Sequence, residues 1–143
     1  MTEIVQVLAV LSVGSLIGVE FAVTAFFHPI LERLPEPAYA QARSASARIL
    51  GRVMPFWYGV AVLSVVAAAV IRPGPLVIAA VAGLVLVMLL TLAVLVPINN
   101  RVGAWSSDDV SRAEARRWDR LHWVRVGLLA VVCVLLVLVA GAW

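Results

Sequence analysis

The residues best suited to chemistry lie in residues 96–127, between the third and the last long apolar runs of the chain. This stretch reads VPINNRVGAWSSDDVSRAEARRWDRLHWVRVG, with His122 and Arg125 near its end. Histidine is the side chain that titrates closest to neutral pH, so His122 is a candidate base. Arginine and asparagine side chains can donate hydrogen bonds to an enolate or phenolate as its charge develops. The segment therefore indicates that proton abstraction from a weakly acidic aromatic ketone is within reach.

Two further ionisable residues lie on the first apolar run. Glu20, Thr24 and His28 follow one another at intervals of four, so they share one stripe of a helix. An ionised side chain at mid-bilayer without a partner costs at least ~2.5–3.5 kcal/mol. We therefore expect Glu20 to face a partner inside the protein, which is Arg125 first and otherwise His28 or His122.

The composition is that of a membrane protein. The 143 residues are 64% hydrophobic with a mean hydropathy of +1.06, whereas a soluble domain is about 45–50% apolar. Runs of roughly 20 apolar residues can span a bilayer as helices. The sequence predicts one all-α membrane domain over residues 1–143, a four-helix bundle with short interfacial helices in two loops. The predicted transmembrane helices cover residues 4–27, 52–71, 76–96 and 121–142, and the predicted interfacial helices cover residues 37–50 and 107–120.

Prolines and glycines set the predicted helix ends. Pro29 and Pro97 are expected to end the first and third spans, because proline disfavours a helical conformation in the residue before it. Gly51 is expected to be a hinge between the first interfacial helix and the second span. Ser106 followed by Asp109 resembles a capping box, and we expect the helix that it opens to continue into the last span.

The first interfacial helix has a modest apolar face in the sequence. That face is formed by Ala38, Ala42, Ala45 and Ile49. Arg43 and Arg48 are expected to point elsewhere. A solvated linker helix is an alternative interpretation of the same pattern.

The charge distribution predicts the orientation in the membrane. All eleven basic residues are arginine, and they cluster between the apolar runs, which is the positive-inside pattern rather than a nucleic-acid surface. Eight arginines lie in residues 28–51 and 97–120, and only Arg72 lies on the opposite side. We therefore expect an integral protein of the plasma (inner) membrane with Arg-rich cytoplasmic loops and both termini outside. Gly14 and Gly18 form a small-xxx-small pair on the first helix, which suggests a homo-oligomer contact.

This topology brings the polar residues to one end of the bundle, where we expect a pocket for a flat lipophilic molecule. The candidate catalytic residues are His122, His28, Arg125, Asn100 and Glu20. The candidate substrate-binding residues are Trp118, Asn99, Arg52, Trp57 and Trp105. Taken singly, each tryptophan is better explained as an interface anchor, and the case for a pocket depends on the polar residues that gather with them.

A metal site is the alternative chemistry. His28, His122 and Glu20 match the two-histidine, one-carboxylate ligand set of non-haem iron. They lie at different depths and without a tight spacing motif, so we expect no tightly bound cofactor, with iron or copper as the alternative. Cys133 has no partner of ligand spacing.

Several segments resemble a known family. They are LVPINNRV at 95–102, RW at 117–118 and LHWVR at 121–125, with FHPIL at 27–31 and GRVMP at 51–55. Together they are similar to the anthrone oxygenases of aromatic polyketide pathways, which belong to a family of small four-helix membrane proteins. The resemblance implies four transmembrane helices and, for the oxygenase branch, conversion of an anthrone to an anthraquinone with O2. The functional residues that the resemblance implies are Asn99, Asn100, Trp118, His122 and Arg125.

The predicted function is therefore a membrane oxygenase that forms an enolate by base catalysis. His122 is the expected base, with possible help from His28, while Arg125 and Asn100 hold the oxyanion and tryptophans stack on the rings. Two alternatives stay open. One is a non-enzymatic membrane protein, such as a small-molecule binder, a transporter subunit or a partner of another membrane protein. The other is a metal-dependent membrane oxidase.

Overall fold

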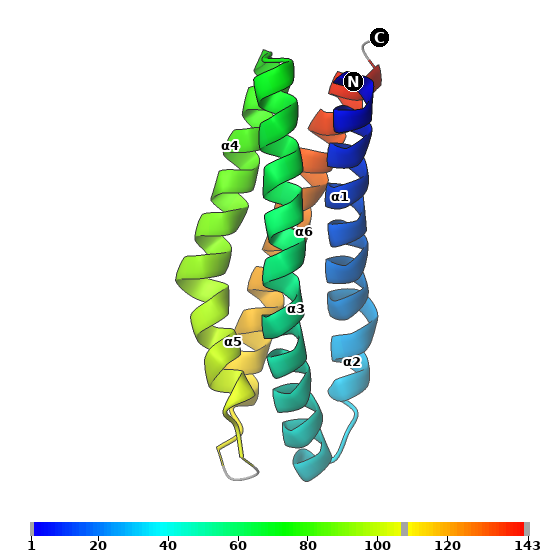
Figure 1. Ribbon diagram of the computed structural model, residues 1–143. Coiled ribbons are helices and arrows are strands. Elements are labelled where there is room, and N and C mark those ends of the chain that lie inside the picture. Colours follow the sequence, from blue (N-terminus) through cyan, green and yellow to red (C-terminus); the bar gives the residue numbers. More distant parts are fainter. Residues whose placement is uncertain (1, 107–108, 142–143) are drawn as a thin grey trace.

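The computed structural model describes residues 2–106 and 109–141, without the side chain of Thr2. All regular elements within these residues are helical, and they form four long helices that run up and down through the bundle (Figure 1). Each long helix is apolar enough to cross a membrane. The predicted four-helix membrane bundle is thus confirmed.

The first and third long helices are each built from three segments. The first consists of α1 (Thr2–Ala22), a π-helical turn η1 (Val23–Phe27) and α2 (His28–Leu31). The third consists of α4 (Pro75–Leu90), the π-helical turn η2 (Thr91–Leu95) and α5 (Val96–Gly103). The second and fourth are single helices, α3 (Glu36–Ile71) and α6 (Arg112–Gly141).

The prediction that Pro29 and Pro97 end their helices is wrong. The N–H groups of His28 and Val96, each just before a proline, bond to the carbonyls of Val23 and Thr91 five residues back. Such a wide turn makes room for the proline ring and re-satisfies backbone groups that proline would leave without a partner. Each helix therefore continues beyond its proline.

Residues 37–50 do not form a separate interfacial helix, because α3 continues through Gly51 without a break. Gly51 serves close packing instead of bending. A Cβ at this position would lie 3.1 Å from Nδ2 of Asn99, which donates a hydrogen bond of 3.0 Å to the carbonyl of Ala47. The absence of a side chain at Gly51 thus lets α5 approach α3.

The apolar face predicted for residues 37–50 is exposed at both of its ends. Ile49 is 62% exposed and Ala38 is exposed, whereas Arg43 is buried. The buried residues of this part of α3 are Tyr39, Ala40, Arg43, Ser44 and Ala47. The inward face therefore carries the polar groups.

The start of α6 differs from the predicted capping box. Ser106 Oγ donates to Asp109 Oδ2 at 3.2 Å, but this pair lies before the helix, which begins at Arg112. The N–H of Glu114 donates to Ser111 Oγ at 3.2 Å, so Ser111 caps the helix. The predicted start at residue 107 lies outside the described residues. From Arg112 the helix continues into the last span, as expected.

The start of α1, the end of α6 and the 72–74 turn lie at one end of the bundle, and the α2–α3 connection, the end of α5 and the start of α6 lie at the other (Figure 1). We call the latter the loop end. Away from the loop end the core is a layer of Ala, Val and Leu side chains. A Cβ at Gly83 would lie 2.9 Å from Cγ2 of Val132, so α4 and α6 pack in close contact there. This tight half leaves the space for a site to the half nearer the loop end.

Candidate functional site

A cavity of about 550 Å³ lies between the four long helices. Small-molecule sites are typically about 300–1,000 Å³. Valine, leucine, methionine and proline side chains form most of its wall. The polar residues of the wall are Glu20, Tyr58, Thr91, Asn99, Asn100, Trp118, His122 and Arg125. The cavity is thus an apolar chamber with a polar region, which suits a lipophilic ligand that carries a few polar atoms.

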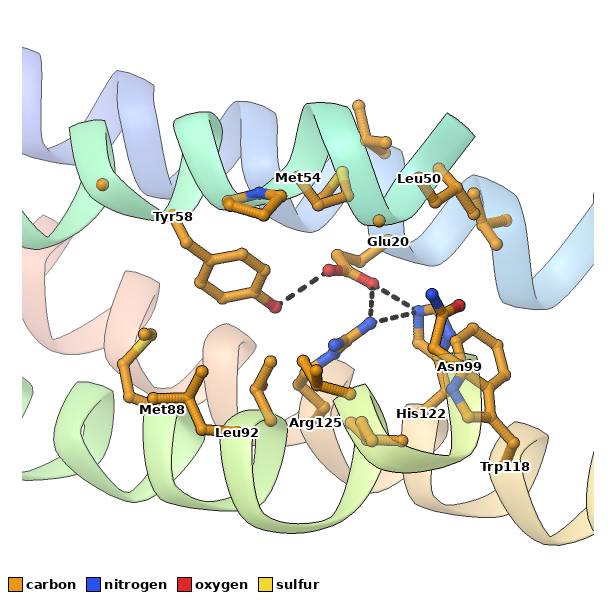
Figure 2. Close-up of a pocket in the computed structure, with 18 of the residues that line it drawn as sticks. Glu20, Leu50, Met54, Tyr58, Met88, Leu92, Asn99, Trp118, His122 and Arg125 are labelled. Atoms are coloured by element: carbon orange, nitrogen blue, oxygen red, sulfur yellow. Dashed lines mark hydrogen bonds and ion pairs between the residues drawn. The ribbon is translucent and has the colours of Figure 1, made fainter. Parts of the chain in front are cut away.

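The carboxylate of Glu20 is the centre of the polar region (Figure 2). Its Oε2 accepts a hydrogen bond of 2.5 Å from Nη2 of Arg125 and is also in contact with Nε2 of His122. Its Oε1 accepts a hydrogen bond of 2.8 Å from the hydroxyl of Tyr58. Glu20, His122 and Arg125 are buried, so the charges compensate one another where water cannot. Of the three expected partners of Glu20, Arg125 and His122 both contact its carboxylate, whereas His28 pairs with Asp119.

The period of α6 brings two of these residues together. The inward-facing residues of α6 recur at intervals of three and four, which places them on one face. They are Ala115, Trp118, His122, Arg125, Leu129, Val132 and Leu136, and Val126 next to Arg125 is buried as well. The face is polar toward the loop end and apolar beyond Arg125, so the same helix lines the cavity and completes the packed core.

Three polar atoms on the α6 part of the cavity wall lack a hydrogen-bond partner among the described residues. They are Nε1 of Trp118, Nδ1 of His122 and Nε of Arg125, and all three are buried. Buried polar groups in folded proteins are nearly always paired, so unpaired ones beside a cavity call for a ligand or ordered water. The indole and guanidinium N–H groups are donors, and they match a ligand oxygen that accepts hydrogen bonds.

A second polar cluster lies between this wall and the loop end. Oδ1 of Asp119 is 3.0 Å from Nδ1 of His28 and is paired with Nη2 of Arg43. The same Nη2 atom donates to the carbonyl of Ala115 at 3.4 Å. The ring of Trp118 connects the two clusters, with its centroid 5.0 Å from that of His28 and 4.6 Å from that of His122. The cluster therefore supports the position of the residues that line the cavity.

Loss of Asp119 is expected to destabilise the protein more than loss of a surface carboxylate. In Asp119→Ala, the buried Arg43 loses its carboxylate partner and His28 loses its hydrogen bond, at a cost of about 1–3 kcal/mol. Unfolding by sodium dodecyl sulfate in mixed micelles measures this change in the free energy of unfolding.

The matched control is Glu114→Ala on the same helix. Its partner Arg101 is 56% exposed, and exposed ion pairs contribute only about 0–1 kcal/mol. Equal effects of the two substitutions would contradict a structural role for the second cluster.

The structure brings some of the predicted site residues together and leaves others apart. Glu20, Asn99, Asn100, Trp118, His122 and Arg125 all line the cavity. His28 is one layer away, where it pairs with Asp119, and its ring centroid is 5.7 Å from that of His122. Asn100 is exposed at the rim.

Three predicted substrate-binding residues do not line the cavity. Arg52 is exposed on α3. Trp57 donates a hydrogen bond of 3.1 Å to Ser15 Oγ, and Trp105 packs against side chains near the loop end. Trp57 and Trp105 are thus packing residues in this fold, and the prediction that they and Arg52 line the pocket is wrong.

Sequence reasoning missed three polar partners. Tyr58 donates a hydrogen bond to Glu20, and Arg43 and Asp119 pair in the second cluster. One sequence signal points to Asp119, which directly follows Trp118 in the spaced series Trp118, His122 and Arg125. This spacing does not say whether the side chain of Asp119 faces inward or outward.

The glycine pair on α1 is not needed for packing within one chain. A Cβ at Gly14 or Gly18 would meet no atom within 4 Å. The face that carries both is therefore open among the described residues.

The fold and cavity define a class: a small integral-membrane four-helix bundle with a ligand-sized chamber in one half. Comparison with known proteins adds the family, since the model of the family described as anthrone oxygenase matches residues 38–135. The chain belongs to the anthrone oxygenase family. No curated protein and no solved structure matches it. The matched region contains Tyr58, His122 and Arg125, whereas Glu20 and His28 lie before it.

Proposed function

We propose that this protein is a membrane-embedded oxygenase that acts on a lipophilic, anthrone-like aromatic ketone with O2. It forms an enolate by base catalysis and needs no tightly bound cofactor. One observation carries the proposal: a largely apolar cavity is lined by a histidine–carboxylate pair and by buried donors without partners. A flat ketone would fill the apolar space, and its oxygen would satisfy the donors.

Glu20 prepares His122 to act as the base. A carboxylate only accepts hydrogen bonds, so the Nε2 atom that faces Glu20 carries the proton. This assignment leaves the lone pair of neutral His122 on Nδ1, which has no partner among the described residues. When Nδ1 takes a proton from the substrate, the imidazolium is stabilised by Glu20 in the way that a buried carboxylate serves a catalytic histidine.

The donors on the wall stabilise the anion that forms. Removal of a proton from the methylene carbon sends the electron pair toward the ketone oxygen, which becomes an oxyanion. Nε–H of Arg125 and Nε1–H of Trp118 are the candidate donors to this oxygen, with the Asn100 amide at the rim. Asn99 already donates to Ala47, so it shapes the wall.

Oxygenation then follows from the electron-rich anion. The enolate carbon gives its electrons to O2, a C–O bond forms, and the resulting peroxide takes the proton from His122. Loss of the remaining hydrogen on that carbon and cleavage of the O–O bond release water and leave a second ketone. Each turnover consumes one O2 and produces one quinone and one water, and the base returns to its starting state.

The test is O2 uptake by purified protein in detergent with anthrone as substrate. Uptake above the autoxidation rate of anthrone in the same micelles, matched by the appearance of anthraquinone, supports the proposal. Uptake equal to that of the micelles alone contradicts it.

A binder without turnover is the alternative that the same cavity favours. It predicts that anthraquinone quenches tryptophan fluorescence in a saturable way, while anthrone is not consumed faster than in empty micelles. The metal-dependent alternative has less support, because no three His, Cys, Asp or Glu residues within 2–106 and 109–141 are placed to hold a metal. Stoichiometric iron or copper in the purified protein would favour it.

The orientation is part of the proposal. The loop end carries arginines such as Arg33, Arg48 and Arg116, and the positive-inside rule places such an end in the cytoplasm of a cell with a plasma (inner) membrane. The bilayer is then the source of the substrate.

A further inference from the structure

The cavity has a buried side and an exposed side. Its polar residues on α1 and α6, such as Glu20 and His122, are buried. Its residues on the opposite side include Leu63 of α3, which is 72% exposed, and Leu92 of η2, which is 60% exposed. The cavity therefore reaches the surface of the protein between α3 and the η2–α5 segment.

A stripe without large side chains lines the α3 edge of this opening. Gly51, Pro55 and Gly59 follow at intervals of four and line the cavity, and all three are exposed. A Cβ at Gly59 would meet no atom within 4 Å, so the space in front of it is empty of protein. In Figure 2 Met54 and Tyr58 of α3 lie across the cavity from Met88 and Leu92, and Glu20 and Arg125 lie farther along it, toward His122.

The surface around the opening is apolar. Phe56 of α3 is 76% exposed and Leu89 of α4 is 59% exposed, and both lie in helices of membrane-spanning character. Gly59 and Leu63 lie well inside the apolar part of α3. Arg72, the next charged residue, follows Leu63 by more than two helical turns. Residues with such exposure at this depth contact hydrocarbon, so the opening faces lipid acyl chains.

We propose that Gly59 and Leu92 frame a lateral portal through which a lipophilic ligand passes between the bilayer and the cavity. Gly59 sets the width of this portal and thereby the size of the ligand that is admitted. The proposal rests on the proposed function for the chemical class of the ligand, and the route itself follows from the cavity.

The first test needs no ligand. The protein is reduced to one tryptophan, Trp118, by replacing the other four with phenylalanine, and it is reconstituted in nanodiscs of dibrominated phosphatidylcholine. Brominated chains are expected to quench Trp118, which lines the cavity. Gly59→Leu is expected to lower this quenching by about half or more, because quenching needs contact between chain and ring.

The matched control is Gly18→Leu, because a Cβ at Gly18 also meets no atom within 4 Å and Gly18 does not line the cavity. It should leave the quenching unchanged, and Gly59→Ala should give an intermediate value if the larger substitution disturbs folding. Equal quenching in the Gly59 variants and the control would overturn the portal.

The second test measures passage of the ligand. In nanodiscs with native tryptophans, anthraquinone association and dissociation are followed by stopped-flow quenching. A narrowed route slows both directions equally, so Gly59→Leu should lower both rates on the order of tenfold while Kd stays within about twofold. A rise in Kd at an unchanged dissociation rate would mean that the leucine occupies the ligand site, and it would overturn the portal role.

The two proposals fail separately. Loss of lipid quenching in Gly59→Leu together with no turnover of anthrone would keep the portal and reject the oxygenase. Turnover of anthrone together with unchanged lipid quenching in Gly59→Leu would keep the oxygenase and reject the portal.

Discussion

His122→Ala protein is expected to consume O2 with anthrone about 10²–10⁴-fold more slowly than the native protein, because it lacks the general base. The residual rate would come from the donors and the apolar chamber, which hold the ketone and its anion without helping the proton to leave. O2 uptake and anthraquinone absorbance in the same detergent measure the change.

Binding separates loss of chemistry from loss of the site. Anthraquinone should still quench the tryptophans of His122→Ala, with a Kd within about tenfold of the native value, since the apolar wall is intact. Val124→Ala is the matched control: it lies two residues along α6, where its side chain is exposed, and it should turn over at the native rate. Native turnover by His122→Ala would remove the proposed base.

Glu20→Leu protein is expected to be less stable than the native protein by about 3–5 kcal/mol, since a buried Arg125 then lacks its carboxylate. The reason is that the guanidinium stays buried, and Glu20 is the acid that pairs with it among the described residues. Unfolding by sodium dodecyl sulfate in mixed micelles gives the difference.

The paired substitution distinguishes charge from packing. Glu20→Leu combined with Arg125→Leu removes both charges, and stability should return to within about 1–2 kcal/mol of the native value, because buried ion pairs and apolar replacements are often nearly equal in stability. Activity should not return. Glu3→Leu, an exposed acid on the same helix, should change stability little. A double variant as unstable as Glu20→Leu would show that packing, rather than the unpaired charge, governs the effect.

The sequence was sufficient for the bundle and for the main ion pair. Apolar runs give the number of spans, and the cost of a lone charge in hydrocarbon requires that Glu20 find a basic partner at matching depth. Arg125 lies one turn from His122 and has a long side chain, and this position is enough to predict that it pairs with Glu20. These inferences depend only on length, depth and charge, which are local properties of the sequence.

The rest of the site depends on how the helices are rotated about their axes. The apolar face of residues 37–50 predicts an interfacial helix, and this pattern does not say which residues pack against the other helices. Near the loop end of a membrane protein the outward side is itself apolar, and the polar Arg43 turns inward to Asp119. Tyr58 was missed for the same reason, since a tyrosine near a helix end also suits an interface anchor.

The prolines were misjudged for a different reason. The rule that proline ends a helix assumes that the chain has water to satisfy the freed carbonyl. In hydrocarbon it is less costly to widen one turn and continue, and η1 and η2 both do so.

Those two wide turns also fix how the segments beyond them are aligned. A π-helical turn holds one residue more than an α-helical turn does, so a deletion of one residue inside η1 or η2 would restore an α-helical turn and leave the segment after it facing nearly the same way. A deletion in the α-helical part just before either turn would instead rotate everything after it by about 100° around the axis. Asn99 would then move away from the backbone of Ala47, or His28 away from Asp119. The two wide turns are therefore the places in these helices where the loss of a single residue would disturb the polar layers least.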